Sequence, residues 1–327
     1  GRRQARGQGM SVAILGAGAF GTALAVALAR GGQPVTLWSH DPAQAEEIEE
    51  TRETTRRLPG VQLPQGVATT ATVPRAGVAL LAVPTQTLGQ VLAAHRSVLA
   101  DAALVACCKG VDLATGQGPS GVIRATVPTA TPALLSGPSF AVDIAAGLPT
   151  ALTLAAPDDA TAAALQERLA TPTLRLYRST DLTGVELGGA LKNVVAIACG
   201  VTIGAGLGES ARAALMTRGY AEMLRFATAR GAKPETLAGL SGLGDLALTC
   251  SSGKSRNYAY GVRLGAEGRA QTTATTEGIA TARAVAAWAA KEGVDMPITR
   301  MIAALLDGRV SVAQAVDALL ARPLRPE

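Results

Sequence analysis

The sequence predicts an α/β fold, in which an N-terminal doubly wound sheet is followed by an all-helical C-terminal domain. Apolar segments of strand length alternate with helical spacers up to about residue 180, and alanine-rich helical stretches replace them from about residue 184. Hydrophobic residues make up 48% of the chain and aromatic residues only 3%. A core of Ala, Val and Leu suits buried parallel strands and closely packed helices, and 327 residues are enough for two domains.

The first predicted unit is a strand, a glycine turn and a helix. The strand covers Ser11–Leu15, and the sequence GAGAFG leads from it into the helix. Gly16 permits a tight turn, Gly18 lets the backbone approach a pyrophosphate, and Gly21 allows the helix to pack closely on the strand. Free N–H groups at the helix N-terminus suit the anion. The unit predicts a Rossmann-type dinucleotide-binding domain, and the alternative is a glycine-rich turn without a ligand.

The second predicted strand bears on the choice of cofactor. Pro34–Trp38 is followed by Ser-His-Asp, so that the acid, Asp41, does not stand directly at the strand tip. An acid at the tip would bind the ribose 2′-hydroxyl of NAD and repel a 2′-phosphate, whereas Ser39 and His40 can accept NADP. We expect NADP, NAD or both, with NADP favoured, although His40 equally fits a solvated loop.

Five further apolar segments are expected to be strands: Val78–Val83, Ala103–Cys107, Ala133–Ser136, Ala151–Leu154 and Leu174–Tyr177. The first three of them run into unusual segments, which read VPTQ, CKGV and SGPSF. Ligands of open α/β sheets bind just beyond the carboxyl ends of the strands. We therefore expect these three segments to converge on one crevice.

The C-terminal domain is expected to consist mainly of helices near residues 184–204, 209–231, 275–292 and 298–305. A polar Ser-Thr-Asp segment before the first of them marks the division. We expect a Rossmann domain at residues 10–185, a helical substrate and catalytic domain at residues 186–327, and a flexible basic tail at residues 1–9.

Lysine is scarce, because only five of the 30 basic side chains are lysines. Arginine cannot release a proton at physiological pH, whereas a desolvated lysine can, so a scarce lysine marks candidate chemistry. Lys109, Lys192 and Lys254 lie in segments flanked by Gly, Ser or Asn. Lys192 stands in an otherwise apolar helix, where burial should lower its pKa, and Asn193 or Glu186 is a candidate to orient it or a substrate hydroxyl. The alternatives are random codon usage and a lysine that reaches solvent from a helix edge.

Two later segments carry polar groups without a hydrophobic period. SGLGDLALT places the Asp245 carboxylate after a glycine turn, and SSGKSRN gathers hydrogen-bond donors. Arg256 offers a planar fork, and Ser255 and Asn257 add neutral donors, a combination that suits a phosphate. The alternatives are a helix N-cap for Asp245 and an ordinary polar loop for SSGKSRN.

Composition and cysteine spacing argue against several other classes of protein. The four cysteines match neither a zinc spacing nor a disulfide framework, so we expect small core residues and no metal site. The net charge of +5 lies partly in the tail, and we expect no nucleic-acid partner. No uninterrupted apolar stretch reaches about 18 residues, and the N-terminus lacks the order of a signal peptide. We expect no membrane insertion and a cytoplasmic location.

In order, the segments GAGAFGTALA, CCKG, SGPSFA, GVELGGALKNVVAIACG, SGLGDLALTC, SGKSRN and TTEG resemble those of the bacterial NAD(P)-dependent glycerol-3-phosphate dehydrogenases, over essentially the whole chain. The resemblance implies that Lys192 is the general acid and base, supported by Asp245 and Lys109. It implies substrate contacts at Lys109, Gly137, Ser139, Lys192, Asp245, Ser255, Arg256 and Asn257. The expected cofactor contacts, including the three turn glycines, are Gly16, Gly18, Ala19, Phe20, Gly21, His40, Lys109, Ala141, Arg256 and Glu277.

The resemblance also implies a reaction and a place in metabolism. NADPH or NADH would reduce dihydroxyacetone phosphate to sn-glycerol 3-phosphate for phospholipid biosynthesis, while Lys192 protonates the developing alkoxide. The expected partner is this small-molecule substrate, and the sequence leaves open whether the helical domain forms a homodimer. Two alternatives are another NAD(P)-dependent hydroxy-acid dehydrogenase and a non-enzymatic dinucleotide sensor.

Overall fold

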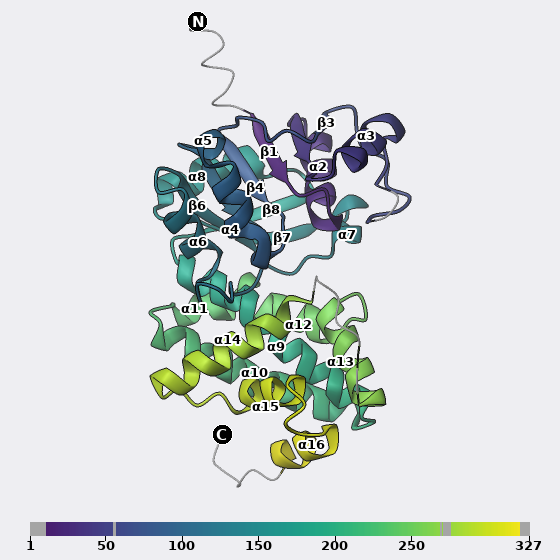
Figure 1. Cartoon of the computed structure of the whole chain (residues 1–327), viewed down its shortest axis with the longest axis vertical. Helices are drawn as coiled ribbons and strands as arrows, with labels where there is room; N and C mark the ends of the chain where they lie inside the picture. The colour runs from purple at the N-terminus through teal and green to yellow at the C-terminus, as the bar shows by residue number, and fades with distance from the viewer. Residues whose placement is uncertain (1–10, 55–56, 269, 271–275, 321–327) are drawn as a thin grey trace, which may run out of the picture.

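The computed structural model describes residues 11–54, 57–268, 270 and 276–320, and it has the two-part α/β architecture that the sequence predicts. Figure 1 shows the half that contains the sheet above the half that consists of helices. The predicted tail at residues 1–9 lies outside the described residues. The predicted division between residues 185 and 186 falls inside helix α9, Leu182–Gly204, and as a domain boundary it stays a prediction.

Within the described residues, eight strands form one sheet in the order β3-β2-β1-β4-β5-β6-β7-β8. The strands are β1 Val12–Leu15, β2 Val35–Trp38, β3 Val67–Thr70, β4 Val78–Leu81, β5 Ala103–Ala106, β6 Thr131–Ser136, β7 Thr150–Ala155 and β8 Leu174–Ser179. Along β1, Ile14 packs into the apolar layer on one face of the sheet and Leu15 into the layer on the other. Helices therefore cover both faces, which is why the strands read as continuous apolar runs.

Two features of the sheet differ from the sequence-based expectation. Strand β3 was not among the expected strands, because its sequence VATT is short and only Val67 in it is buried. Strands β6 and β7 pair antiparallel, whereas every other neighbouring pair is parallel. Only the five-residue helix α7, Ala141–Ala145, stands between β6 and β7, and the chain returns beside β6 in the opposite direction.

Helices of the sheet half pack on the two faces of the sheet. They are α2 Ala19–Arg30, α3 Pro42–Thr51, α4 Thr85–Ala94, α5 Arg96–Leu99, α6 Pro119–Thr126, α7 Ala141–Ala145 and α8 Asp159–Leu169. Helices α2, α3 and α8 lie on one face, and α4, α5 and α6 lie on the other. The helical half contains α9 Leu182–Gly204, α10 Gly208–Ala229, α11 Pro234–Ala238, the π-helical turn η1 Leu240–Gly244, α12 Asp245–Cys250, α13 Arg256–Glu267, α14 Glu277–Glu292, α15 Pro297–Leu306 and α16 Val312–Leu320.

Helix α9 is the centre of the helical half. By length and composition it could cross a bilayer, but 89% of its most apolar window is buried inside the protein, as expected of a core helix. Glycines let its neighbour α13 approach closely, because a Cβ added at Gly200 would lie 2.2 Å from the Tyr258 carbonyl oxygen, and one at Gly261 would lie 2.2 Å from that of Ile197. This packing fixes the rotation of α9, and with it the direction in which Lys192 points.

Candidate active site

The glycine turn after β1 has the shape that a dinucleotide needs. Gly16 has a φ of +118°, and an added Cβ there would lie 2.9 Å from the backbone of Ala82. A Cβ at Gly21 would lie 2.0 Å from the Gly16 oxygen, whereas one at Gly18 would meet no heavy atom within 4 Å. Gly18 also gives α2 no side-chain cap, so the N–H groups of its first turn remain for an anion. Ala19 and Phe20 begin this helix.

The residues after β2 leave the ribose position without a carboxylate of its own. Asp41 caps helix α3, because its Oδ1 accepts a hydrogen bond of 3.0 Å from the Ala43 N–H. The Ser39 hydroxyl is buried and donates to Gln44 Oε1 at 2.6 Å. His40 is exposed. Asp41 is half-buried and engaged as a cap, so the only fully exposed side chain of these three is that of His40, which is not an acid. This fits NADP at least as well as NAD.

Two lysines from the two halves of the protein meet on one carboxylate. Lys192 Nζ lies 2.8 Å from Asp245 Oδ1, and Lys109 Nζ lies 2.6 Å from Asp245 Oδ2. Lys109 Nζ also donates to the Gly137 carbonyl oxygen at 3.0 Å. Asp245 is 1% exposed, and the side chains of Lys192 and Lys109 are 9% and 14% exposed. The cluster holds two positive charges and one negative charge, and the remaining charge suits an anionic substrate or a developing alkoxide.

Burial gives Lys192 the properties of a proton donor. Burial lowers the pKa of the Lys192 ammonium to about 8, Asp245 opposes this shift, and the charge of Lys109 adds to it. A general acid works best when its pKa lies near the working pH. The shift has the direction that the sequence predicts for Lys192.

Thr249 is a member of the cluster to which the sequence analysis gave no role. The Lys192 ammonium donates to Thr249 Oγ1 at 2.7 Å, and this hydroxyl lies 3.3 Å from Asp245 Oδ1. Asp245 and Thr249 stand four residues apart in α12, so they share one face of the helix. That spacing is a signal in the sequence DLALT that could have identified Thr249. Two hydrogen bonds, to Asp245 and Thr249, therefore fix the direction of the Lys192 N–H groups.

Near Asp245, the structure differs from the expected glycine turn and from the alternative in which Asp245 is a helix N-cap. The segment SGLG is not a simple glycine turn but the π-helical turn η1, in which a Cβ at Gly242 would lie 1.9 Å from the Leu237 oxygen. Asp245 begins α12 and does not cap it from outside. Glu186 does not orient Lys192, because its Oε1 instead accepts a hydrogen bond of 2.7 Å from the Ser120 N–H. Asn193, the other candidate, donates to the Lys109 carbonyl oxygen at 3.3 Å.

The Ser-Arg-Asn segment forms the start of helix α13. Ser255 is its N-cap and accepts from the Tyr258 N–H at 3.2 Å, so the segment is not an irregular loop. Arg256 is exposed at the first helical position. Asn257 is buried, and its Oδ1 accepts from the Gly278 N–H at 3.0 Å. The segment is thus tied to the start of helix α14, where Glu277 stands.

Glu277 reaches from the helical half to the sheet half. Its Oε1 accepts from the Thr85 N–H at 3.1 Å and from the Thr85 hydroxyl at 3.0 Å, and its Oε2 lies 3.4 Å from the Lys109 N–H. The loop after β6 lies on the same side: the Ser139 hydroxyl donates to the Gly137 oxygen at 3.2 Å, and Ala141 begins α7. The strand ends of β4, β5 and β6 therefore converge as the sequence predicts.

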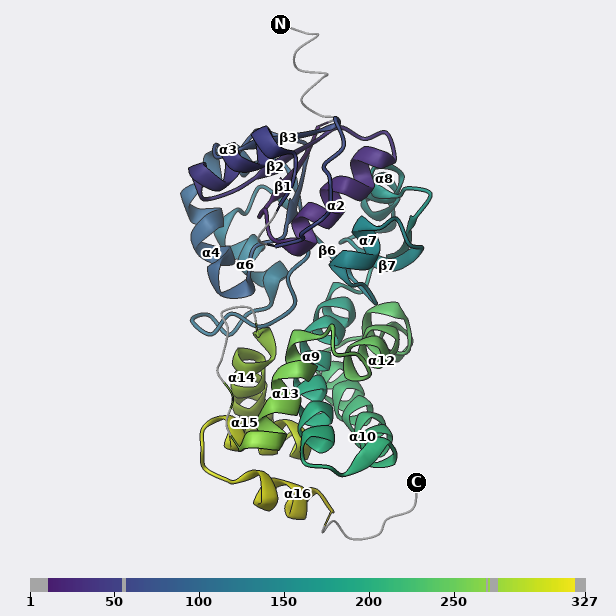
Figure 2. The same ribbon diagram turned by 90° about the vertical axis from the view of Figure 1, so that its right-hand side faces the viewer.

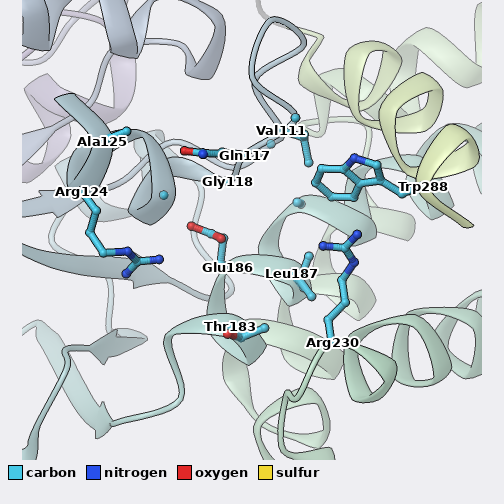
Figure 3. Close-up of a pocket in the computed structure, with 14 residues that line it drawn as sticks. Val111, Gln117, Gly118, Arg124, Ala125, Thr183, Glu186, Leu187, Arg230 and Trp288 are labelled. Atoms are coloured by element: carbon cyan, nitrogen blue, oxygen red, sulfur yellow. The ribbon is translucent and has the colours of Figure 1, made fainter. Parts of the chain in front are cut away.

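A cavity of about 620 Å³ lies on another side of α9 (Figure 3). Glu186 and Ala190 of α9 line it together with Arg124, Arg230 and other residues of both halves. Lys192 follows Ala190 by two residues and points about 200° away around the helix. The cavity is therefore separate from the lysine cluster.

The comparisons with known proteins cover nearly the whole chain. The family model described as NAD-dependent glycerol-3-phosphate dehydrogenase N-terminus matches residues 11–162, and the C-terminus model matches residues 181–317. A glycerol-3-phosphate dehydrogenase [NAD(P)+] of a Ruegeria species is 60% identical over 97% of this chain and 100% of its own length. That of Paracoccus denitrificans is 57% identical over the same shares of the two chains.

Solved structures show the same similarity. The crystal structure of glycerol-3-phosphate dehydrogenase from Coxiella burnetii has a TM-score of 0.89 and 36% identity, over 96% of this chain and 99% of the other. A D-mandelate dehydrogenase complex has a TM-score of 0.62 at 16% identity, over 95% of this chain and 99% of that one. The second likeness concerns the fold alone, so it gives no support to a hydroxy-acid substrate.

Proposed function

The chain belongs to the NAD-dependent glycerol-3-phosphate dehydrogenase family, and from this premise we propose that Lys192, Asp245 and Lys109 form its catalytic centre. The enzyme reduces dihydroxyacetone phosphate to glycerol 3-phosphate with NADH or NADPH, which fits a role in lipid biosynthesis. The observation that supports the assignment is the buried ammonium of Lys192, held 2.8 Å from Asp245. A buried amine of lowered pKa beside a second lysine suits proton transfer to an alkoxide.

The residues of the centre have distinct roles in the proposed reaction. The nicotinamide supplies the hydride. Lys192 gives its proton to the substrate oxygen, and in the reverse direction it takes the proton back. Asp245 and Thr249 hold the Lys192 nitrogen in place, and Lys109 adds a second positive charge that stabilises the oxygen as its negative charge grows. The other proposed contacts are as follows: Gly137, Ser139, Ser255, Arg256 and Asn257 for the substrate, and Gly16, Gly18, Ala19, Phe20, Gly21, His40, Ala141, Arg256 and Glu277 for the cofactor.

An assay of dihydroxyacetone-phosphate-dependent NADPH oxidation tests the roles. Lys192→Ala should reduce kcat by about two to four orders of magnitude with little change in cofactor affinity, because a positioned proton donor contributes about that much. Lys291→Ala, which removes an exposed lysine of α14, is the matched control and should retain activity. Near-normal kcat in Lys192→Ala would refute the general-acid role.

The finer proposals concern cofactor choice, location and assembly. NADPH should be preferred to NADH, because Asp41 is engaged as the cap of α3 and no other acid stands between Trp38 and Pro42. His40→Asp should shift the ratio of kcat/KM toward NADH, since a carboxylate repels a 2′-phosphate. An unchanged ratio would show that His40 does not face the ribose. A cytoplasmic location completes the proposal, and sedimentation velocity distinguishes a homodimer from a monomer.

A further inference from the structure

Two segments on opposite sides of the proposed substrate site are joined at both of their ends. The first runs from Gly137 to Asp143 in the sheet half, and the second runs from Asp245 to Lys254 in the helical half. At the inner end, Lys109 Nζ bonds both the Gly137 oxygen and Asp245 Oδ2, at 3.0 and 2.6 Å. At the outer end, Lys254 Nζ lies 3.0 Å from Asp143 Oδ1. Figure 2 shows α7, which carries Asp143, above α12 of the helical half.

The two ends differ in their exposure to solvent. The inner carboxylate, Asp245, is 1% exposed. At the outer end, the side chains of Lys254 and Asp143 are 57% and 33% exposed. The Lys254 ammonium also lies 5.7 Å from the centroid of the Phe140 ring, within range of a cation–π contact. Lys254 therefore contacts the sheet half through two side chains, at the end of the site that faces water.

The outer contact is coupled to the segment proposed to bind the substrate. Lys254 directly precedes Ser255, the N-cap of α13, and the turn between α12 and α13 is ordered by Ser252. The Ser252 hydroxyl accepts from the Lys254 N–H at 3.2 Å, and its carbonyl accepts from the Ser255 N–H at 3.0 Å. The position of Lys254 is therefore coupled to that of Ser255 at the start of α13, because a short, hydrogen-bonded turn holds the two residues together.

We propose that Lys254, Asp143 and Phe140 form a clasp that closes the outer end of the substrate site and holds the Ser255–Asn257 segment over the phosphate-bearing substrate. The clasp opens when dihydroxyacetone phosphate enters and when glycerol 3-phosphate leaves. An exposed ion pair contributes little free energy, so it opens without a large barrier. Lys254 and Asp143 are positioning residues here, and the inference rests on the proposed placement of the substrate along Ser255–Asn257.

Single substitutions test the positioning role. Lys254→Met keeps an apolar stem of similar length beside Phe140 and removes the charge, and Asp143→Asn removes the other charge. Each should raise the KM for dihydroxyacetone phosphate about two- to five-fold without lowering kcat, as expected from losing an exposed ion pair. The exchanged pair Lys254→Asp with Asp143→Lys should recover most of the loss. An unchanged KM in both single variants, or no recovery in the exchange, overturns this role.

A matched ion pair elsewhere controls for general effects of charge. Arg178 Nε lies 3.1 Å from Asp159 Oδ1, with side-chain exposures of 40% and 68%, and both residues belong to the sheet half. Breaking this pair with Arg178→Met should leave the KM for dihydroxyacetone phosphate unchanged. A rise equal to that of Lys254→Met would show that the effect is not specific to the clasp, and would overturn the proposal.

Cross-linking tests the opening. In the variant Lys254→Cys with Asp143→Cys, a short bismaleimide should reduce turnover at least about ten-fold, since the site can then neither load nor release. Of the native thiols, Cys107, Cys199 and Cys250 are buried and Cys108 is half-buried. Burial raises the pKa of Cys107 to about 12 and also raises that of Cys108, so both thiols react slowly with a maleimide. The double variant Asp159→Cys with Arg178→Cys, treated in the same way, should keep its activity.

The readouts separate failure of the clasp from failure of the proposed function. NADPH binding, followed by cofactor fluorescence, should survive the cross-link, which shows that the protein remains folded. Full turnover after complete cross-linking overturns the clasp while leaving the dehydrogenase intact. Absence of dihydroxyacetone-phosphate-dependent oxidation in the wild-type enzyme would instead overturn the proposed function itself.

Discussion

A single carboxylate, Asp245, serves two ammonium groups in the proposed catalytic centre. One carboxylate cannot neutralise both lysines, so the cluster keeps a positive charge in a place where burial strengthens its field. Thr249 satisfies a further donor of Lys192 without adding a charge. The arrangement therefore orients the Lys192 nitrogen and still leaves the pKa of Lys192 low. A second carboxylate in place of Thr249 would raise that pKa.

The lowered pKa of Lys192 predicts opposite pH dependences for the two directions of the reaction. Reduction needs the protonated amine, which is present below about pH 8 and is lost as the pH rises through that value. Oxidation of glycerol 3-phosphate needs the neutral amine and should rise through the same pH. The measurement is kcat/KM against pH in each direction, with buffers of constant ionic strength.

Removing Asp245 provides the control for this assignment. Asp245 raises the pKa of Lys192 against the effect of burial, so Asp245→Asn should move the inflection to lower pH. An inflection that stays in place would mean that another group controls the rate.

Single residues were predictable from the sequence where their local context was unusual. Lys192 stood out because one ammonium lies in an apolar helix, and that context depends only on neighbours in the chain. The contact between Lys109 and Asp245 spans 136 positions and leaves no mark in either local segment. The cluster as a whole was therefore reached through the family resemblance, and Thr249 was missed because a threonine in a helix is ordinary.

At the scale of elements, acidic side chains from distant parts of the chain accept hydrogen bonds from the N-terminal N–H groups of several helices. Glu222 of α10 is 2% exposed and accepts from the Ile298 N–H at 2.6 Å and the Thr299 N–H at 3.2 Å. These are first-turn groups of α15, which has no side-chain cap of its own. Burial raises the pKa of Glu222, so the carboxylate is costly to bury but satisfies donors that would otherwise have no partner.

We expect Glu222→Ala to lower the free energy of unfolding by roughly 2–4 kcal/mol, because it leaves buried N–H groups unsatisfied and opens a cavity. Glu222→Gln keeps an acceptor oxygen and should cost clearly less. Urea denaturation followed by circular dichroism measures both. Equal losses in the two variants would show that packing, rather than the helix cap, decides the stability.

Elements were predictable where a long periodic pattern coincided with turn residues, as in the glycine turn and α9. Strand β3 and the π-helical turn η1 were not, for two physical reasons. Only Val67 of β3 is buried, so its apolar pattern is weak. The form of η1 depends on the backbone of Leu237, which leaves no room for a side chain at Gly242. The antiparallel pairing of β6 and β7 is likewise a tertiary property.

At the scale of the whole molecule, three acidic side chains of the helical half bind groups of the sheet half. Asp245 binds Lys109, Glu277 binds the N-terminus of α4, and Glu186 binds that of α6. Two of these contacts touch the proposed active site. The third, at Glu186, lies on another side of α9, beside the cavity in Figure 3. We therefore expect loss of the Glu186 contact to lower stability without lowering kcat, in contrast to the two contacts at the active site.

Glu186 gives the test of that separation. A Cβ at Gly118 would lie 2.1 Å from the Glu186 carboxylate, so the carboxylate fills the space at the start of α6 and binds the Ser120 N–H. Glu186→Ala should lower the free energy of unfolding by about 1–3 kcal/mol, the cost of one unsatisfied buried group, and should leave kcat unchanged. Glu186→Gln, which keeps an acceptor, should lose less. Thermal denaturation and the NADPH assay on the same preparations measure the two effects, and a fall in kcat without a loss of stability would mean that this contact acts on the lysine cluster after all.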